Sequence, residues 1–317
     1  MPRVAAIDCG TNSIRLLVAD LTIGDDGSRV LHDVHREMRI VRLGQDVDAT
    51  GRLAPEALER TRASVADYAA IATCTGVDRA RMVATSATRD AANRDDFFGM
   101  VRDALGTEAE VITGEEEAQL SFTGAVGDLE PGDGPFLVVD VGGGSTEVVL
   151  GSWDGVRADV HAARSVDVGC VRITERHLRA DPPAEGDVGA AREFAARTLA
   201  DAFTEVPVEK SRSWVGVAGT VTTLSAVAQG LPAYDAARTH LSRLPLSQLR
   251  DVAANLLSAT HEERSANPAI HPGRVDVIAG GALIVQVLAE ELHTRAGIDE
   301  LVVSEHDILD GIALSLA

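Results

Sequence analysis

Residues 4–18 read VAAIDCGTNSIRLLV, and residues 136–150 read FLVVDVGGGSTEVVL. The two stretches follow one plan, in which an apolar strand ends in an aspartate, Asp8 or Asp140, and a turn of glycine and hydroxyl residues leads into a second apolar strand. Such a turn presents backbone N–H groups and hydroxyls to an anion, and glycine lets the anion approach the backbone closely. The aspartate beside the turn is placed to hold a metal ion bound to the same anion. The repeat therefore predicts two phosphate-binding hairpins that together clamp a phosphate.

The elements around the two hairpins also follow one order. Strands are expected at 4–8, 13–20 and 29–42, and again at 136–140, 146–151 and 156–166 after a loop at 128–135 that is rich in glycine and proline. Further strands are expected at 81–84, 109–112, 214–217 and 301–304, and helices at 53–73, 93–105, 115–126, 169–178, 187–203, 218–229, 246–257, 275–293 and 307–316. Residues 85–89 are expected to form a turn. The pattern predicts an α/β protein whose architecture is repeated.

The length of the chain suits two domains, because 317 residues are too many for one ordinary hydrophobic core. We expect an N-terminal domain formed by residues 1–127 plus 304–317, and a second domain at 128–303. The cysteines show no paired spacing, no apolar run approaches the roughly 18 residues of a membrane span, and the first residues lack the features of a signal peptide. These observations favour a cytoplasmic protein with reduced thiols and no membrane partner.

The charge balance is strongly acidic, with a formal net charge of −20 from 29 basic and 49 acidic side chains. Nucleic-acid binding, which requires a basic surface, is therefore not expected. A phosphate chain can still be bound where arginines and a bound Mg²⁺ reverse the field locally. The nine histidines are spread along the chain without the spacing of metal ligands.

Two acidic residues of the second hairpin, Asp140 and Glu147, are candidate metal ligands. Their separation of seven residues places them on the two arms of one hairpin, where both can face its mouth. A hard divalent cation, Mg²⁺ or Mn²⁺, shared between these carboxylates and phosphate oxygens would relieve the charge of the anion. Asp8 is the equivalent residue of the first hairpin, and either metal contact or simple turn capping would account for it.

Four motifs resemble those of one known family, the exopolyphosphatase / guanosine-pentaphosphate phosphatase (Ppx/GppA) family. They are Ala6-Ile7-Asp8-Cys9-Gly10-Thr11-Asn12-Ser13, Ala84-Thr85-Ser86-Ala87-Thr88-Arg89, Ile112-Thr113-Gly114-Glu115-Glu116-Glu117-Ala118 and Asp140-Val141-Gly142-Gly143-Gly144-Ser145-Thr146-Glu147, with weaker matches at 217–222, 273–278 and 303–305. The resemblance implies a two-domain actin-like ATPase (ribonuclease H-like) fold of the sugar-kinase and heat-shock-ATPase superfamily. It also implies a homodimer, and the length is similar to that of the short forms without the family's C-terminal extension.

The resemblance also implies roles for individual residues. Glu117 stands at the position of the catalytic base, which orients and deprotonates the attacking water, with Glu116 as the alternative; Arg89 stands where an arginine neutralises the transferring phosphoryl group. The residues expected to bind phosphate are Gly10, Thr11, Asn12, Ser13, Gly142, Gly143, Gly144, Ser145, Thr146, Gly219 and Thr220, and the expected metal ligands are Asp140, Glu147 and Asp8.

The function favoured by these residues is hydrolysis of a terminal phosphoanhydride. Inorganic polyphosphate is the first candidate substrate and guanosine pentaphosphate the second, and the catalytic residues do not discriminate between them because both contain the same bond. A small-molecule kinase of the same superfamily fits the glutamate-rich motif at 113–118 less well. A protein that senses polyphosphate or an alarmone without turnover remains the alternative of another class.

Overall fold

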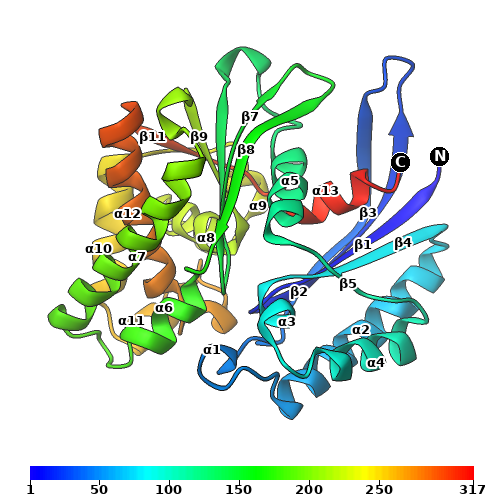
Figure 1. Cartoon of the computed structure of the whole chain (residues 1–317), viewed down its shortest axis with the longest axis horizontal. Helices are drawn as coiled ribbons and strands as arrows, with labels where there is room; N and C mark the ends of the chain where they lie inside the picture. Colours follow the sequence, from blue (N-terminus) through cyan, green and yellow to red (C-terminus); the bar gives the residue numbers. More distant parts are fainter. The chain divides into compact units, whose positions relative to one another are not determined.

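The computed structural model describes all 317 residues. The chain forms two compact units: unit 1 is Met1–Gly127, Asp154–Arg157 and Ile308–Ala317, and unit 2 is Asp128–Trp153 and Ala158–Asp307 (Figure 1). The boundary expected after residue 303 thus lies after residue 307 in this division, and the tip of one hairpin, Asp154–Arg157, is grouped with unit 1. No helix combines the length and the apolar character needed to cross a membrane.

Unit 1 contains a five-stranded mixed sheet in the order β3-β2-β1-β4-β5. Its strands are β1 (Arg3–Cys9), β2 (Ser13–Ile23), β3 (Arg29–Ile40), β4 (Arg79–Ala84) and β5 (Glu110–Val111). The first three strands are antiparallel neighbours, whereas β4 and β5 run parallel to β1. In the register of the first hairpin Asp8 lies opposite Arg15.

Helices cover both faces of this sheet. They are α1 (Val47–Thr50), α2 (Pro55–Thr75), α3 (Ser86–Asp90), α4 (Arg94–Leu105), α5 (Gly114–Ala125) and α13 (Ile308–Leu314). Alternate residues of β1 enter different cores: Ala5 and Ile7 pack in the cluster that includes residues of α2 and α4, and Val4 and Ala6 pack in the cluster that includes residues of α13. Burial on both faces explains why β1 reads as a continuous apolar run.

Unit 2 repeats the same sheet order and adds one edge strand. Its strands are β6 (Phe136–Val141), β7 (Thr146–Trp153), β8 (Ala158–Val166), β9 (Ser213–Val217), β10 (Arg243–Pro245) and β11 (Glu300–Val303). The order β10-β11-β9-β6-β7-β8, read from β8, matches that of unit 1 strand for strand as far as β11. Here the cross-strand partner of Asp140 is Glu147.

The helices of unit 2 build one large core around α12. They are α6 (Cys170–His177), α7 (Glu185–Glu205), α8 (Ala218–Ala228), α9 (Ala236–Thr239), α10 (Leu246–Ser258), α11 (His261–Ser265) and α12 (Ile278–Ala296), and short 3₁₀ turns occur at Pro131–Asp133, Val208–Lys210 and Pro272–Arg274. Helix α12 contacts α6, α7, α8 and α10, and its residues from Ile278 to Ala289 are buried on every side, with Gln286 partly exposed. A helix that is apolar all round is expected in this central position.

The duplicated sheet with helices confirms the expected α/β fold class. The expectation of a turn at residues 85–89 is wrong, because α3 begins at Ser86 directly after β4. Thr85 at its N-cap makes no side-chain capping bond, so the helix carries no capping signal in the sequence. The short elements α1, α9, α11 and β10 were also not predicted, since each is too short for a periodic pattern.

Candidate active site

The glycine turn, Gly142–Ser145, joins β6 to β7. The backbone at the start of α6 forms hydrogen bonds with it. The Gly142 N–H donates to the Ser145 carbonyl at 3.1 Å and closes the hairpin. The carbonyl oxygens of Gly142 and Gly143 accept the first three N–H groups of α6, at 2.9, 2.9 and 3.2 Å. Helix N-termini expose N–H groups without intrahelical partners, and here the turn's own carbonyls satisfy them. The turn is therefore fixed to the body of unit 2 through its carbonyl side.

The opposite side of the glycine turn offers hydrogen-bond donors. The Arg172 Nε atom donates to the Gly144 carbonyl at 2.8 Å, so three successive carbonyls of the turn are engaged by α6. No backbone hydrogen bond within the protein uses the N–H groups of Gly143 and Gly144. A run of unused N–H groups in a turn is suited to binding an anion. Gly169 makes this packing feasible, because a Cβ there would lie 2.4 Å from the Gly143 carbonyl.

Two buried carboxylates lie beside the glycine turn. Asp140 is 7% and Glu147 1% exposed, and the two are direct cross-strand partners. The Ser165 hydroxyl of β8 donates to Glu147 Oε1 at 2.7 Å, which orients the carboxylate. Two neighbouring carboxylates removed from water are costly unless positive charge compensates them. Oxygen ligands of this kind fit Mg²⁺ or Mn²⁺, and Asp140 and Glu147 would hold the ion.

The asparagine turn, Gly10–Ser13, repeats this construction in unit 1. The segment that follows β3 donates backbone N–H groups from Gly44 to the Thr11 carbonyl, at 2.8 Å, and from Val41 and Arg42 to the Asn12 carbonyl, at 3.1 and 2.9 Å. The Asn12 side-chain Nδ2 is buried and has no hydrogen-bond partner in the protein. An orphaned buried donor in a turn of this kind is suited to a phosphate oxygen.

Asp8, at the end of β1, differs from Asp140 in its surroundings. The Arg15 guanidinium donates to Asp8 Oδ2 through Nη2 at 2.7 Å and through Nε at 3.0 Å. The register position that carries a second carboxylate in unit 2 therefore carries a cation in unit 1. A metal contact of Asp8 stays a prediction, and its charge is already balanced within unit 1.

The structure brings together the two residues expected to be catalytic, Glu117 and Arg89. Thr113 caps α5 by accepting the Glu116 N–H at 3.1 Å. Glu117 follows within the first turn and is only 7% exposed. Arg89, from α3, donates through Nη1 to Glu117 Oε2 at 3.1 Å and to the Ile112 carbonyl at 3.0 Å.

The neighbouring glutamates of α5 lie in different surroundings. Glu116 is ion-paired with Arg81 at 2.7 Å, and Glu115 is exposed. Glu117 is therefore the only one of the three that is buried, which favours it over Glu116 as a group that acts on a sequestered water.

The third expected phosphate contact, Gly219 and Thr220, lies at the junction of β9 and α8. Ala218 adopts a left-handed conformation there, with φ of +67°, which is uncommon for a residue with a Cβ. The Arg274 guanidinium packs on Gly219 so closely that a Cβ would lie 1.9 Å from it. Thr220 is buried, 2% exposed. The strained backbone and the adjacent guanidinium are features typical of a functional junction.

Sequence reasoning did not find Arg15, Gly169 and Arg172. Gly169 and Arg172 lie in the stretch Val168–Arg172, which follows β8, the third strand of unit 2. Residues 41–44 follow β3, the third strand of unit 1, in the same way, and this parallel could have indicated them. Their partners are distant in sequence, so the contacts appear only in the fold. Burial and a nearby positive charge also act on Cys170: burial raises the pKa of its thiol, and Arg274 partly opposes that shift.

A duplicated ribonuclease H-like sheet, with a turn of glycine and hydroxyl residues after the first strand of each unit, defines a protein of the actin-like ATPase fold. The Ppx/GppA phosphatase family model matches residues 22–316. Over its whole length the chain is 58% identical to Exopolyphosphatase 2 of Mycobacterium tuberculosis and covers 99% of that protein. The chain therefore belongs to the Ppx/GppA phosphatase family and is a hydrolase.

Solved structures agree with this assignment. An exopolyphosphatase-like protein is 43% identical with a TM-score of 0.93, covering 100% of this chain and 98% of that one. The Ppx/GppA family member of Aquifex aeolicus is 33% identical with a TM-score of 0.79, covering 99% of this chain and 97% of that one. The fold expected from the motifs is thus confirmed by its structural relatives.

Proposed function

We propose that this protein is a metal-dependent exopolyphosphatase that releases terminal phosphate from inorganic polyphosphate. The observation that carries the proposal is the pair of buried carboxylates, Asp140 and Glu147, beside a turn whose outward N–H groups are unused. The name of the M. tuberculosis relative supports polyphosphate as the substrate. Turn, carboxylates and a buried glutamate together supply what a phosphoanhydride hydrolase requires: an anion cradle, a cation site and a base.

In this proposal each group has a separate task. The glycine turn and the asparagine turn bind phosphate oxygens, with the Asn12 amide as an additional donor. Asp140 and Glu147 would hold Mg²⁺ or Mn²⁺, which would supply positive charge to the phosphate groups. Glu117 accepts a proton from the water that attacks the terminal phosphorus in line, and Arg89 orients Glu117 and stabilises the charge of the transferring group.

The substrate is tested by measuring phosphate release with Mg²⁺ from short polyphosphate, long polyphosphate and guanosine pentaphosphate in parallel. Glu117→Gln should keep binding and lose turnover by roughly 10²–10⁴-fold, because the amide cannot accept the proton. Glu116→Gln is the matched control: it removes the neighbouring carboxylate, whose partner is Arg81, and should leave turnover within a few-fold of wild type.

Each outcome has a distinct meaning. Faster release from polyphosphate, dependent on Glu117, supports the proposal, whereas faster release from guanosine pentaphosphate moves the assignment to a guanosine pentaphosphate 5′-phosphohydrolase. Binding of phosphate chains without release would indicate a sensor. Comparable activity of Glu117→Gln would remove Glu117 from the mechanism.

We also propose, from the family resemblance, that the protein acts in the cytoplasm as a homodimer. Light scattering coupled to gel filtration measures the molar mass in solution; the chain mass of 33.3 kDa would identify a monomer and overturn this part of the proposal.

A further inference from the structure

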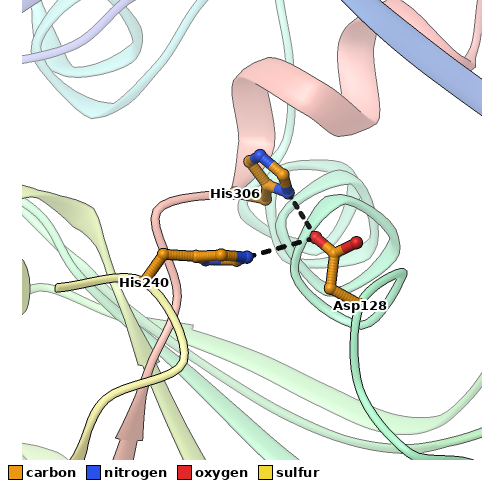
Figure 2. Close-up of side chains that lie close together, drawn as sticks. All are labelled: Asp128, His240 and His306. Carbon is orange, nitrogen blue, oxygen red and sulfur yellow. Dashed lines mark hydrogen bonds and ion pairs between the residues drawn. The ribbon is translucent and has the colours of Figure 1, made fainter. Parts of the chain in front are cut away.

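Three side chains that are distant in sequence point toward one another in unit 2 (Figure 2). Asp128 follows α5, His240 follows α9, and His306 lies between β11 and α13. Asp128 Oδ2 is 2.6 Å from His306 Nδ1 and 3.3 Å from His240 Nε2. One candidate ligand atom from each residue lies within 4.8 Å of the others, and the two imidazole rings are 4.7 Å apart between centroids.

The proposed hydrolysis uses none of these three residues. They belong neither to the two phosphate turns nor to the Asp140–Glu147 pair or the Arg89–Glu117 pair. Their side chains are partly exposed, by 46% for Asp128, 23% for His240 and 37% for His306, so an ion can reach them from solvent. Both imidazoles point at the same carboxylate oxygen of Asp128. Three candidate metal-ligand atoms therefore lie close together.

We propose that Asp128, His240 and His306 form a second metal site, for a divalent transition metal of the Zn²⁺, Co²⁺ or Ni²⁺ type. Imidazole nitrogen together with one carboxylate is a ligand set typical of these ions, whereas Mg²⁺ prefers oxygen ligands. Three protein ligands leave the fourth position of a tetrahedral ion to water. The site differs in this ligand chemistry from Asp140 and Glu147, which offer oxygens.

Metal binding must change the positions of the imidazole protons of His240 and His306. His240 Nδ1 accepts the Glu305 N–H at 3.2 Å, so in the neutral ring the proton is on Nε2 and is donated to Asp128. His306 donates to the same oxygen from Nδ1. A metal ion takes the place of these protons at His306 Nδ1 and His240 Nε2. Each neutral ring keeps one proton on its other nitrogen, which is Nε2 in His306 and Nδ1 in His240. The long Glu305–His240 hydrogen bond is lost, and three metal–ligand bonds are formed.

Metal binding requires the three ligand atoms, which all lie within 4.8 Å of one another, to move to nearly equal spacing. Ligands of a tetrahedral zinc ion at about 2.0–2.1 Å from the metal are about 3.3 Å apart. The His240–Asp128 separation already has that value, and the His306–Asp128 contact must lengthen from 2.6 Å. Asp128 is the first residue of unit 2 and His306 is next to its last, Asp307. The metal would therefore tie together the segments by which the chain enters and leaves unit 2.

The test measures Zn²⁺ bound to chelator-treated full-length protein in excess Mg²⁺, which occupies sites made of oxygen ligands. We expect one Zn²⁺ per chain by elemental analysis after gel filtration. We also expect Co²⁺ to give the intense visible absorption of a four-coordinate site, and Zn²⁺ to raise the midpoint of thermal unfolding. His240→Ala and His306→Ala should each weaken binding by about 100-fold.

His293→Ala is the matched control, because His293 is an exposed histidine of the same unit that pairs with one aspartate, Asp299, at 2.9 Å. It should bind Zn²⁺ like wild type. If the alanine variants do not fold, NMR of the wild-type protein labelled with ¹⁵N in its histidines provides the test. Zn²⁺ must then shift the signals of the ring nitrogens of two histidines. Asp128→Asn must prevent these shifts. Failure of wild type to bind Zn²⁺, or equal binding by all variants, would overturn the proposal.

Discussion

Glu147 is the direct cross-strand partner of Asp140, whereas the corresponding partner of Asp8 is Arg15. The two hairpins share sheet position, turn closure and anchoring of the turn carbonyls, yet they differ in charge at this one register position. Two neighbouring carboxylates in unit 2 are suited to a cation, as proposed above, whereas Asp8 in unit 1 is already paired with Arg15. The duplicated scaffold thus differs between its two units in the charge of a single cross-strand pair.

The first prediction concerns Ser165, which orients Glu147. Ser165→Ala should raise the Mg²⁺ concentration for half-maximal phosphate release by about 10–100-fold, because groups that orient metal ligands contribute to affinity on that scale. Glu147→Gln should have a larger effect, since it removes the ligand charge itself. The measurement is a Mg²⁺ titration at saturating substrate.

The control for this series lies in the same hairpin. Ser152→Ala removes a hydroxyl that contacts the exposed His161 at 3.1 Å, and should leave the Mg²⁺ requirement unchanged. An unaltered Mg²⁺ requirement in Glu147→Gln would show that this carboxylate does not hold the metal.

The second prediction concerns Gly169, whose close approach to Gly143 shapes the glycine turn. In Gly169→Ala the new methyl would lie 2.4 Å from backbone atoms of Gly143, so the turn or α6 must shift. We expect a loss of stability of about 1–3 kcal/mol, as for overpacking, together with reduced kcat/KM for phosphate release.

A glycine of unit 2 without close neighbours serves for comparison. Gly189 is exposed in α7, and nothing lies within 4 Å of a Cβ built there. Gly189→Ala should stabilise the protein by up to about 1 kcal/mol and leave kinetics unaltered, since alanine favours helix. Equal stability and kinetics of Gly169→Ala and Gly189→Ala would show that the glycine turn tolerates a displacement.

The third prediction concerns the Arg15–Asp8 pair, which is largely buried: the side chains are 19% and 7% exposed. Arg15→Met leaves Asp8 without its cation and should cost about 2 kcal/mol of stability, less than the ~3–5 kcal/mol found for fully buried pairs because Arg15 retains some solvent contact. Thermal and urea unfolding measure the loss.

An exposed pair of the same unit provides the reference. Arg62 and Glu59, in α2, are 50% and 64% exposed, and Arg62→Met should leave the stability nearly unchanged. A loss in Arg15→Met as small as in Arg62→Met would mean that Asp8 is compensated by other groups.

The sequence predicts those parts of the protein that are encoded locally. The hairpins were found because each buried strand, aspartate and turn are contiguous, and α5 was found because Thr113 and the acidic residues after it mark a helix start. Helix α3 was missed because its five residues show neither a cap nor a period. The fold class was predictable because the strand–turn–strand unit is repeated.

Contacts between distant segments could not be read from the sequence. Arg172 reaches Gly144 across 28 positions, and Asp128 and His306 are separated by 178. Histidine spacing gave no metal signal for this reason: the ligands of the cluster come from three loops, and only the folded sheet order brings those loops together. The difference in charge between the surroundings of Asp8 and Asp140 likewise appears only through their cross-strand partners.

The last prediction concerns the three free cysteines. Cys74 is exposed, whereas Cys9 and Cys170 are buried. Burial raises the pKa of the Cys9 thiol well above its usual range, with the Asp8 charge adding to the effect, and burial also raises the pKa of Cys170. A thiol with a raised pKa is protonated and unreactive at neutral and mildly alkaline pH, since the thiolate is the nucleophile.

We therefore expect native protein to react with a thiol reagent at Cys74 alone, and unfolded protein to react at all three cysteines. Cys74→Ser should abolish the fast phase, and a moderate rise in pH should not recruit Cys9 or Cys170, because both thiols are buried and burial raises the pKa of each. Fast labelling of Cys170 in the native Cys74→Ser variant would show that the start of α6, which holds the glycine turn, opens to solvent. In that case the turn would not be the fixed anion cradle on which the proposed hydrolysis depends.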